Sequence, residues 1–201
     1  MRTLYPIFNR TESRAAKEAR LAQRGCVVWM TGLSGSGKST IAIALEQRLS
    51  AMGYLCCVVD GDNIRHTINA DLGFSAADRA ENIRRTAQLC HLLASTGIVT
   101  IASLLCPTNA MRHTAEQIIG SDDLIVVHIS TPIEECERRD VKGLYARARA
   151  GLIMDFTGIS APFEVPERAD ITIDTTECTV EQSVDYIVYK IKNRIEYGVQ
   201  P

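Results

Sequence analysis

The stretch GLSGSGKST, Gly32 to Thr40, lies between two apolar runs and decides how this chain folds. It follows CVVWMT (26–31), which has the length and β-branched content of a strand, and it precedes residues 38–52, whose spacing predicts a helix. Its glycines allow a tight loop whose backbone N–H groups converge on anionic oxygens. The spacing G-x-x-x-x-G-K-[ST] is that of a phosphate-binding P-loop.

Each part of this loop has a predicted role in binding a nucleoside triphosphate. Lys38 would reach the outer phosphates, Ser39 would ligate Mg²⁺, and the N-terminus of the following helix would favour negative charge. The alternative is an ordinary glycine–serine turn, and the order strand, loop, lysine, hydroxyl and helix argues against it. The residues expected to bind ATP here are Gly32, Ser34, Gly35, Ser36, Gly37, Lys38, Ser39 and Thr40.

Length and composition limit the class of protein. The chain has 201 residues, 46% of them hydrophobic, which suffices for one sizeable core. Its net charge of −2 argues against nucleic-acid binding. No apolar run has the length of a membrane span or the form of a signal peptide. We therefore expect a cytoplasmic protein with no membrane partner, whose seven scattered cysteines are buried free thiols.

Strand-like and helical segments alternate along the chain, which predicts an α/β fold with a central parallel sheet covered by helices on both faces. Apolar residues at helical spacing, from Ile83 to Ala94 and from Val180 to Ile195, predict two helix faces that pack on the core. Besides residues 26–31, the expected strands are residues 55–60, 99–105, 124–129 and 171–174.

Two segments stand apart from this alternation. Residues 1–24 are predicted to be an N-terminal extension, with a short surface helix within 11–23, and residues 25–201 to be the P-loop domain. Residues 140–166 are rich in glycine, lysine and arginine, poor in regular pattern and long for a plain connection. Loops of this length are often lids, so we expect a lid here.

Two carboxylates follow the second expected strand, which ends in VVDGD (58–62). This position places Asp60 and Asp62 at the carboxyl edge of the sheet, near the P-loop. Carboxylates there can hold Mg²⁺ or accept a proton from an acceptor hydroxyl. Ser39, Asp60 and Asp62 are therefore candidate metal ligands, and Asp62 is also a candidate base. The alternative for Asp62 is a helix N-cap.

Basic and amide side chains gather after these carboxylates, around the aromatic residue Phe74. Bases stack on rings, and anions pair with guanidinium groups. Arg79 and Asn82 are three residues apart, so they share a face of a helix and can act jointly. The alternative is that Phe74 belongs to the core and that Arg84 and Arg85 belong to a solvated helix face. The polar members of the cluster are Arg65, Arg79, Asn82, Arg84 and Arg85.

Five blocks in this order resemble the adenylylsulfate kinase family, from Gly25 to about Glu196. The resemblance implies a Mg²⁺-dependent kinase, often a homodimer, that transfers a phosphoryl group from ATP to the ribose 3′-hydroxyl of adenylylsulfate in sulfate assimilation. Functional coupling to an ATP sulfurylase is compatible with it. The blocks are GLSGSGKST, DGDNIRHTINADLGFS, DRAENIRR, RDVKGLYARARAG and DFTGISAPFEVPE.

The resemblance also implies how the acceptor is bound. Arg65, Arg79 and Asn82 would hold the sulfate–phosphate part of adenylylsulfate. The adenine would stack between Phe74 and Phe156.

For the reaction itself, the resemblance implies three further positions. Lys142 would lie near the transferred group, Asp62 near the acceptor hydroxyl and magnesium, and Arg139 against the ATP adenine. Lys38, Asp62 and Lys142 are thus the expected catalytic residues. The lid would close over both nucleotides and keep water from the γ-phosphate.

One block departs from the family. Residues 105–109 read LCPTN where many relatives have Ile-Ser-Pro, an aromatic residue and arginine, although Arg112 remains. Such a change could accompany a different nucleotide-linked acceptor, which is the main rival function. A non-catalytic nucleotide-binding module is the other rival, and the intact P-loop lysine and paired carboxylates argue against it.

Overall fold

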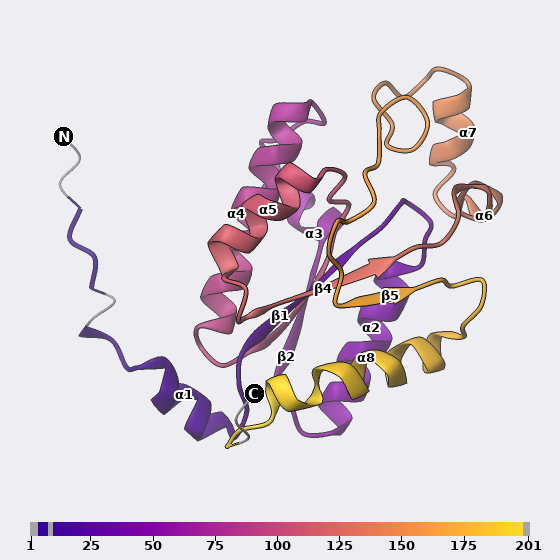
Figure 1. Cartoon of the computed structure of the whole chain (residues 1–201). Helices are drawn as coiled ribbons and strands as arrows, with labels where there is room; N and C mark the ends of the chain where they lie inside the picture. Colours follow the sequence, from indigo (N-terminus) through magenta and orange to yellow (C-terminus); the bar gives the residue numbers. More distant parts are fainter. Residues whose placement is uncertain (1–3, 8–9, 199–201) are drawn as a thin grey trace.

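A central parallel sheet organises the computed structural model, which describes residues 4–7 and 10–198 (Figure 1). Within these residues, five strands pair in the order β2-β3-β1-β4-β5, every pair being parallel. Each strand lies where the sequence predicted it, with ends that differ by at most two residues. The strands are β1 (Cys26–Thr31), β2 (Cys56–Asp60), β3 (Val99–Ser103), β4 (Leu124–Ile129) and β5 (Ile171–Ile173).

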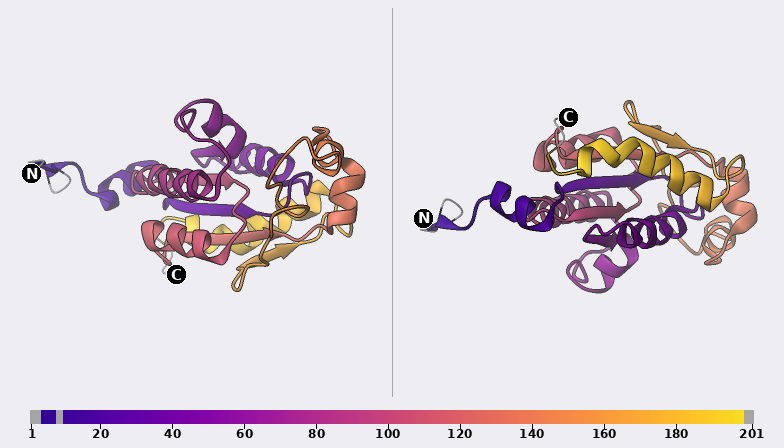
Figure 2. Two further views of the ribbon diagram at one scale, coloured as in Figure 1. Left: turned by 90° about the horizontal axis from the view of Figure 1, so that it is seen from above. Right: turned by 90° about the horizontal axis from the view of Figure 1, so that it is seen from below.

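Helices cover both faces of the sheet, which confirms the predicted α/β fold (Figure 2). Helices α2 and α8 pack on one face, and α4 and α5 pack on the other. In the described residues the helices are α1 (Arg14–Leu21), α2 (Lys38–Ala51), α3 (Gly61–His66), α4 (Ala76–Ala94), α5 (Asn109–Ile119), α6 (Ile133–Arg139), α7 (Leu144–Arg149) and α8 (Val180–Ile195).

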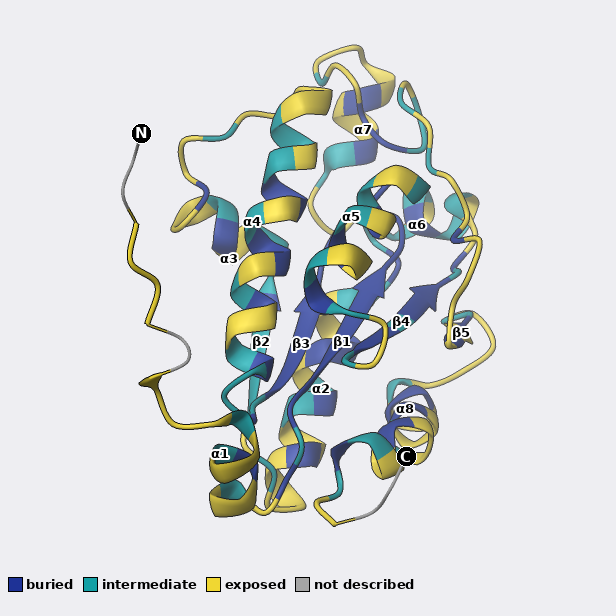
Figure 3. Ribbon diagram, turned by 60° about the vertical axis from the view of Figure 1, so that its left-hand side comes forward, coloured by how far each residue is buried: buried dark blue, intermediate teal, exposed yellow. Residues whose placement is uncertain are grey.

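Strand β1 is buried along its whole length, as Figure 3 shows. Successive side chains of a strand point to opposite faces. Val28 and Met30 therefore pack with α2 and α8, whereas Val27 and Trp29 pack with α4 and α5. Because both faces of β1 are packed in the core, the first residues of the loop that follows it are held in place.

The predicted helix of the N-terminal segment is shorter than residues 11–23 and is fixed to the amino edge of the sheet. Ser13 caps α1, and Arg14 donates to Asp123 Oδ1 at 2.7 Å and to the Gly25 carbonyl at 2.7 Å. Glu18 is buried, and its carboxylate accepts the Gly25 N–H at 3.0 Å. The helix is thus attached through charged side chains and does not simply lie on the surface.

The expected lid, residues 140–166, is more regular than its sequence suggested, because α7 lies inside it. Gly143 is the N-cap of this helix, and the Asp140 carboxylate accepts the N–H groups of Tyr145 and Ala146 in its first turn at 2.9 and 3.0 Å. A small third hydrophobic cluster joins the segment to the rest of the chain. Its buried members are Leu33, Cys136, Tyr145, Ala148 and Phe156.

The cysteines are all free, as predicted. Cys26, Cys90, Cys106 and Cys136 are buried. The prediction that the thiols are buried fails at Cys178, which is exposed, and at Cys56 and Cys57, which are half-buried.

Across the described part of the chain, no helix has both the length and the apolar character needed to cross a membrane.

Candidate active site

The P-loop forms the predicted anion-binding nest. Gly35 and Gly37 have φ of +75° and +98°, a left-handed backbone that glycine adopts without strain. Gly37 is also the N-cap of α2, and no side chain caps this helix. The N–H groups of the first turn of α2 are therefore open to an anionic ligand.

Three hydroxyl groups from outside the loop hold its backbone in place. Thr131 and Thr175 each donate to the Ser36 carbonyl, at 3.0 and 3.2 Å, and Tyr145 donates to the Ser34 carbonyl at 2.9 Å. None of these three residues was predicted from the sequence. Thr131 and Thr175 each lie just beyond the end of a strand, a position that could have indicated them.

Lys38, the first residue of α2, folds back over the loop. Its ammonium donates to the Leu33 carbonyl at 2.6 Å and lies 3.4 Å from Ser36 Oγ. Burial lowers the pKa of Lys38 to about 8. A triphosphate in the nest would supply the negative charge that this partly buried ammonium lacks.

Ser39 and Asp60 meet where β2 ends beside the P-loop. Ser39 Oγ donates to Asp60 Oδ2 at 2.8 Å. Asp60 Oδ1 accepts the Asp62 N–H at 3.0 Å, so Asp60 is the N-cap of α3. The alternative that Asp62 is the cap was therefore wrong, because the helix begins two residues earlier than that alternative required.

The oxygen atoms of Ser39 and Asp60 suit a hard cation. Mg²⁺ is usually held by one or two carboxylates, with water and substrate phosphates completing its shell. Among the described residues, no group of three or more His, Cys, Asp or Glu side chains could hold a metal by itself. The donors present thus fit Mg²⁺ that arrives with a nucleotide.

Asp62, in the first turn of α3, forms an ion pair with Lys142 of the lid segment. Both side chains are largely exposed, with 73% and 57% of their surface accessible. The structure therefore brings together two of the three predicted catalytic residues.

Arg139, at the end of α6, lies against the P-loop. Its Nη1 donates to Thr175 Oγ1 at 2.7 Å, and its Nε donates to Glu135 Oε1 at 2.7 Å. A Cβ atom added to Gly37 would lie 3.9 Å from this guanidinium. The arginine is thus beside the nucleotide loop, while its contact with an adenine stays a prediction.

Phe74 is exposed between two arginines. Its ring centroid lies 4.6 Å from the guanidinium carbon of Arg65 and 5.8 Å from that of Arg79. Burial lowers the pKa of both arginines, and neither forms an ion pair with a carboxylate in the described residues. Two guanidinium groups without counterions beside an open ring suit a ligand that carries a base and an anion.

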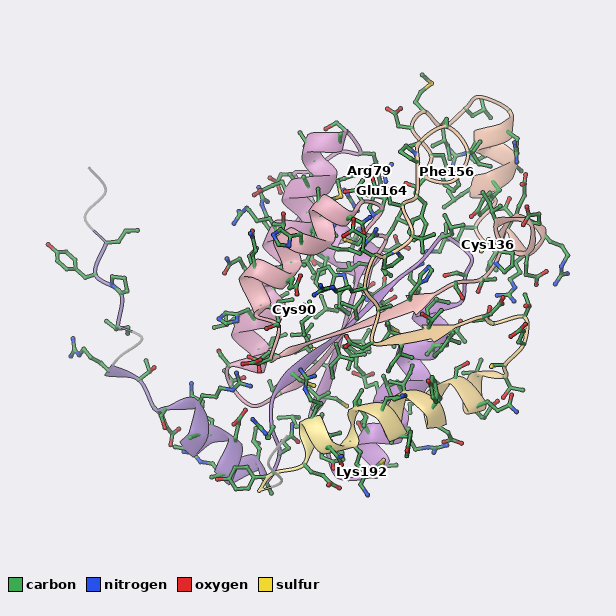
Figure 4. The ribbon with its side chains drawn as sticks, in the orientation of Figure 1. Arg79, Cys90, Cys136, Phe156, Glu164 and Lys192 are labelled. Atoms are coloured by element: carbon green, nitrogen blue, oxygen red, sulfur yellow. The ribbon has the colours of Figure 1, made fainter. Side chains whose placement is uncertain are left out.

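Phe156 has a different environment from Phe74. It is buried in the third hydrophobic cluster, edge-on to Tyr145 with 5.0 Å between the ring centroids. Its chain neighbours Asp155 and Thr157 contact Arg79, which donates to the Asp155 carbonyl at 2.9 Å. Phe156 and Arg79 lie at the same end of the molecule (Figure 4). Stacking a base on both predicted aromatic residues thus requires the lid segment to shift, and this pairing stays a prediction.

The remaining members of the predicted cluster divide into two kinds. Asn82 is 5% exposed, and its side-chain oxygen accepts a hydrogen bond from Asn69 at 3.0 Å. Arg84 pairs with Glu81, and Arg85 pairs with Glu81 and Asp71, all on the outer side of α4. The alternative of a solvated helix face is thus confirmed for these two arginines.

A hollow among the described residues lies away from the predicted site residues. It has a volume of about 600 Å³ and is lined by the end of β4 and by residues 158–163. His128 and Phe163 stack within it, with 6.1 Å between their ring centroids. None of the predicted site residues lines it, and Phe74, Asp62 and Lys142 are exposed elsewhere on the surface.

The loop that departs from the family pattern fastens the end of the lid segment. Arg112 donates to the Cys106 carbonyl at 2.6 Å and to the Glu164 carbonyl at 2.7 Å. Asn109 Oδ1 accepts from Arg112 at 2.7 Å, and the Asn109 N–H donates to Glu164. The changed residues therefore form contacts within the protein.

Cys106→Ser is expected to leave kcat and both KM values within about twofold of the wild type. The Cys106 side chain is fully buried, and burial raises the pKa of its thiol to about 12, so it has no nucleophilic role. Steady-state kinetics with each substrate varied in turn checks this expectation. A folded variant with strongly reduced turnover would show that the local departure is functional.

Phe74→Ala is expected to weaken acceptor binding about tenfold and to leave ATP binding unchanged, because a base loses a stacking contact worth roughly 1–3 kcal/mol. Phe156→Ala should also lower the free energy of unfolding, since replacing a buried phenylalanine by alanine typically costs about 3–5 kcal/mol. Binding titrations and thermal unfolding of both variants test this difference. Equal loss of both nucleotides in Phe74→Ala would instead indicate that the local fold has collapsed.

The P-loop between β1 and α2 of a five-stranded parallel sheet defines the class of the chain, which is a P-loop kinase. The adenylylsulphate kinase family model matches residues 24–174. The chain belongs to this family and is a kinase.

Individual relatives agree with this assignment. The adenylyl-sulfate kinase of Bacteroides thetaiotaomicron is 54% identical over 193 residues, 96% of both chains. That of Phocaeicola vulgatus is 56% identical over 185 residues, 92% of this chain and 91% of the relative. The structure of the APS kinase CysC of Mycobacterium tuberculosis, in complex with AMPPNP and APS, has a TM-score of 0.81 and 42% identity. It covers 84% of this chain and 98% of that one.

Proposed function

We propose that this chain transfers the γ-phosphoryl group of ATP to the ribose 3′-hydroxyl of adenylylsulfate, giving 3′-phosphoadenylylsulfate and ADP for sulfate assimilation. The observation that carries the proposal is the place of Asp62. It lies two residues after Asp60, which contacts the P-loop serine, and three residues before Arg65. A carboxylate there would lie between a donor and an acceptor nucleotide.

The donor would be bound by the P-loop, Gly32 to Thr40, with its phosphates on the N-terminus of α2. Lys38 would offset the charge that develops on the transferred group, and Arg139 would contact the ATP adenine. Ser39, Asp60 and Asp62 would hold Mg²⁺, and the bound ion would supply positive charge against the phosphate oxygens.

The acceptor would lie along α3 and α4. Its adenine would stack on Phe74 and, after a shift of the lid segment, on Phe156. Arg65, Arg79 and Asn82 would bind the sulfate–phosphate anhydride at the other end of the ligand. Asp62 would take the proton of the 3′-hydroxyl, and Lys142 would leave Asp62 to contact the transferred phosphoryl group.

Residues 140–166 would act as the lid of a kinase domain formed by residues 25–201, with residues 1–24 as an extension. The cluster of Tyr145 and Phe156 with Leu33 supports this role, because it links the lid segment to the P-loop. Residues 1–3, 8–9 and 199–201 of these ranges lie outside the described residues. A cytoplasmic location, a homodimer and coupling to an ATP sulfurylase complete the proposal.

The choice of acceptor tests this function. Adenylylsulfate should be phosphorylated efficiently with MgATP, whereas AMP should be a poor substrate. Without the terminal group of the anhydride, donors of the site would be left unpaired. The measurement supplies adenylylsulfate, AMP, ADP and other nucleotide anhydrides, and locates the new phosphate by phosphorus NMR.

Three results would contradict the proposal. Efficient use of another anhydride with adenylylsulfate ignored would favour the rival kinase, whose acceptor differs. Nucleotide binding without turnover of any acceptor would favour a non-catalytic module. Product with phosphate anywhere but the 3′ position would also overturn the assignment.

A further inference from the structure

The two ends of the Asn82 side chain have different surroundings. Its Oδ1 accepts a hydrogen bond of 3.0 Å from Asn69 Nδ2. Its Nδ2 donates to no other described residue, and this nitrogen is not completely buried. Asn82 lies one helical turn after Arg79, so this free donor and the Arg79 side chain belong to the same face of α4.

Asn69 is held firmly although it lies in the connection between α3 and α4. It is fully buried, its N–H donates to the Ile64 carbonyl at 2.9 Å, and its own carbonyl accepts the Leu72 N–H at 3.1 Å. Its Oδ1 is enclosed and has no hydrogen-bond partner in the described part of the chain. The single hydrogen bond made by this side chain is therefore the one to Asn82.

A primary amide presents a donor at one end and an acceptor at the other. In this structure Asn69 offers its NH₂ group, so Asn82 turns its oxygen toward Asn69 and its own NH₂ group away from it. In the reverse orientation Asn82 would present an oxygen to the cleft, which repels an anion. The orientation of one buried amide thus sets whether the next one attracts or repels the acceptor.

We propose that Asn69 is a positioning residue for the acceptor nucleotide, since its amide holds Asn82 with the NH₂ group toward the anionic part of the ligand. This inference rests on the proposed function, because it takes the acceptor to carry an anhydride anion near Asn82. Asn69 does not touch the ligand. It acts through Asn82 alone.

The test uses two replacements of Asn69 that are close to it in size. In Asn69→Asp, a carboxylate can only accept, so Asn82 must turn its NH₂ group to it and present oxygen to the ligand. In Asn69→Leu, the hydrogen bond is lost and Asn82 is free to choose. The Kd of adenylylsulfate is measured by calorimetry on protein saturated with MgADP, which has no γ-phosphoryl group to transfer.

Asn69→Asp should raise the Kd of adenylylsulfate at least tenfold and leave the Kd of ADP within twofold. Asn69→Leu should raise it less, by about threefold, because a free Asn82 can still turn toward the anion. Thr86→Val is the matched control. It removes a buried hydroxyl that donates to the Asn82 carbonyl at 2.7 Å without touching the amide, and should leave the Kd within twofold.

Repeating Asn69→Asp in an Asn82→Ala background separates positioning from other effects. The additional change in Kd should then be less than twofold. A tenfold change that persists would assign the effect to the new charge and overturn the proposal. If Asn69→Leu raised the Kd of adenylylsulfate as much as Asn69→Asp does, Asn69 would only stabilise the connection between α3 and α4. This result would also overturn the proposal.

The controls also keep the two proposals apart. If the wild-type protein does not bind adenylylsulfate, the proposed function fails. If it binds and both Asn69 variants bind equally well, only the role of Asn69 fails. Thermal unfolding confirms that each variant is folded, and a variant that unfolds is replaced by Asn69→Ser, which should fall between wild type and Asn69→Asp.

Discussion

Lys38→Ala should lower kcat on the order of 10²–10³-fold, the typical effect of removing one preorganised donor from a transition state. Its ammonium lies over the P-loop, 2.6 Å from the Leu33 carbonyl, and a bound triphosphate would draw it to the transferred group. Charge on that group develops during transfer, so the loss should affect turnover more than ATP binding. Single-turnover kinetics and ATP binding measurements check this expectation.

The control for this variant removes a lysine far from the site. Lys190 lies on the exposed face of α8 beside Tyr186, and Lys190→Ala should keep wild-type kcat. The Lys38 variant should remain folded, because the hydroxyls of Thr131 and Thr175 still hold the loop through the Ser36 carbonyl. A folded Lys38→Ala protein with wild-type kcat would show that the P-loop lysine takes no part in the chemistry.

The fold could be predicted from the sequence because its signals are local. Strand β1 reads as a continuous apolar run since both of its faces are buried, and the glycines after it can serve few purposes other than an anion nest. The same holds for Ser39 and Asp60. Each lies at the end of an element whose type was clear, so the parallel sheet brought them to one edge.

Other parts of the site depend on contacts between distant segments, which no local pattern encodes. Phe74 and Phe156 both read as aromatic residues in polar surroundings, yet one is open and the other is packed against Tyr145. Asn82 shares a helix face with Arg79, but its burial depends on Asn69, which lies thirteen residues earlier in the chain. The periodicity of the sequence predicts which residues share a face of a helix, but it does not predict which other segment packs on that face.

The lid segment illustrates the same limit. Its glycines and charges suggested an irregular loop, whereas Asp140 accepts an N–H group from the first turn of a helix within it and Tyr145 donates to the Ser34 carbonyl. The P-loop backbone is thus connected directly to the segment that contains Lys142. A movement of this segment would therefore act on both nucleotides at once, which couples closure to the assembly of the catalytic groups.

Asp62→Asn is expected to lower kcat by about 10²–10⁴-fold, the range that a positioned general base contributes. Asparagine keeps the size of the side chain but cannot take the proton of an acceptor hydroxyl. The ion pair with Lys142 is largely exposed, and such pairs contribute only about 0–1 kcal/mol, so stability should hardly change. ATP affinity should also stay close to the wild type, because the P-loop contacts remain.

The measurement compares kcat, the Kd of ATP and the thermal unfolding of Asp62→Asn with those of Asp71→Asn. Asp71 is a matched control, an exposed carboxylate that pairs with Arg85 on the outer side of α4. Loss of turnover in Asp62→Asn alone would place the proton transfer at Asp62. Wild-type kcat in this variant would remove the base from the mechanism, and its pairing with Lys142 would then serve only to hold the lid segment against α3.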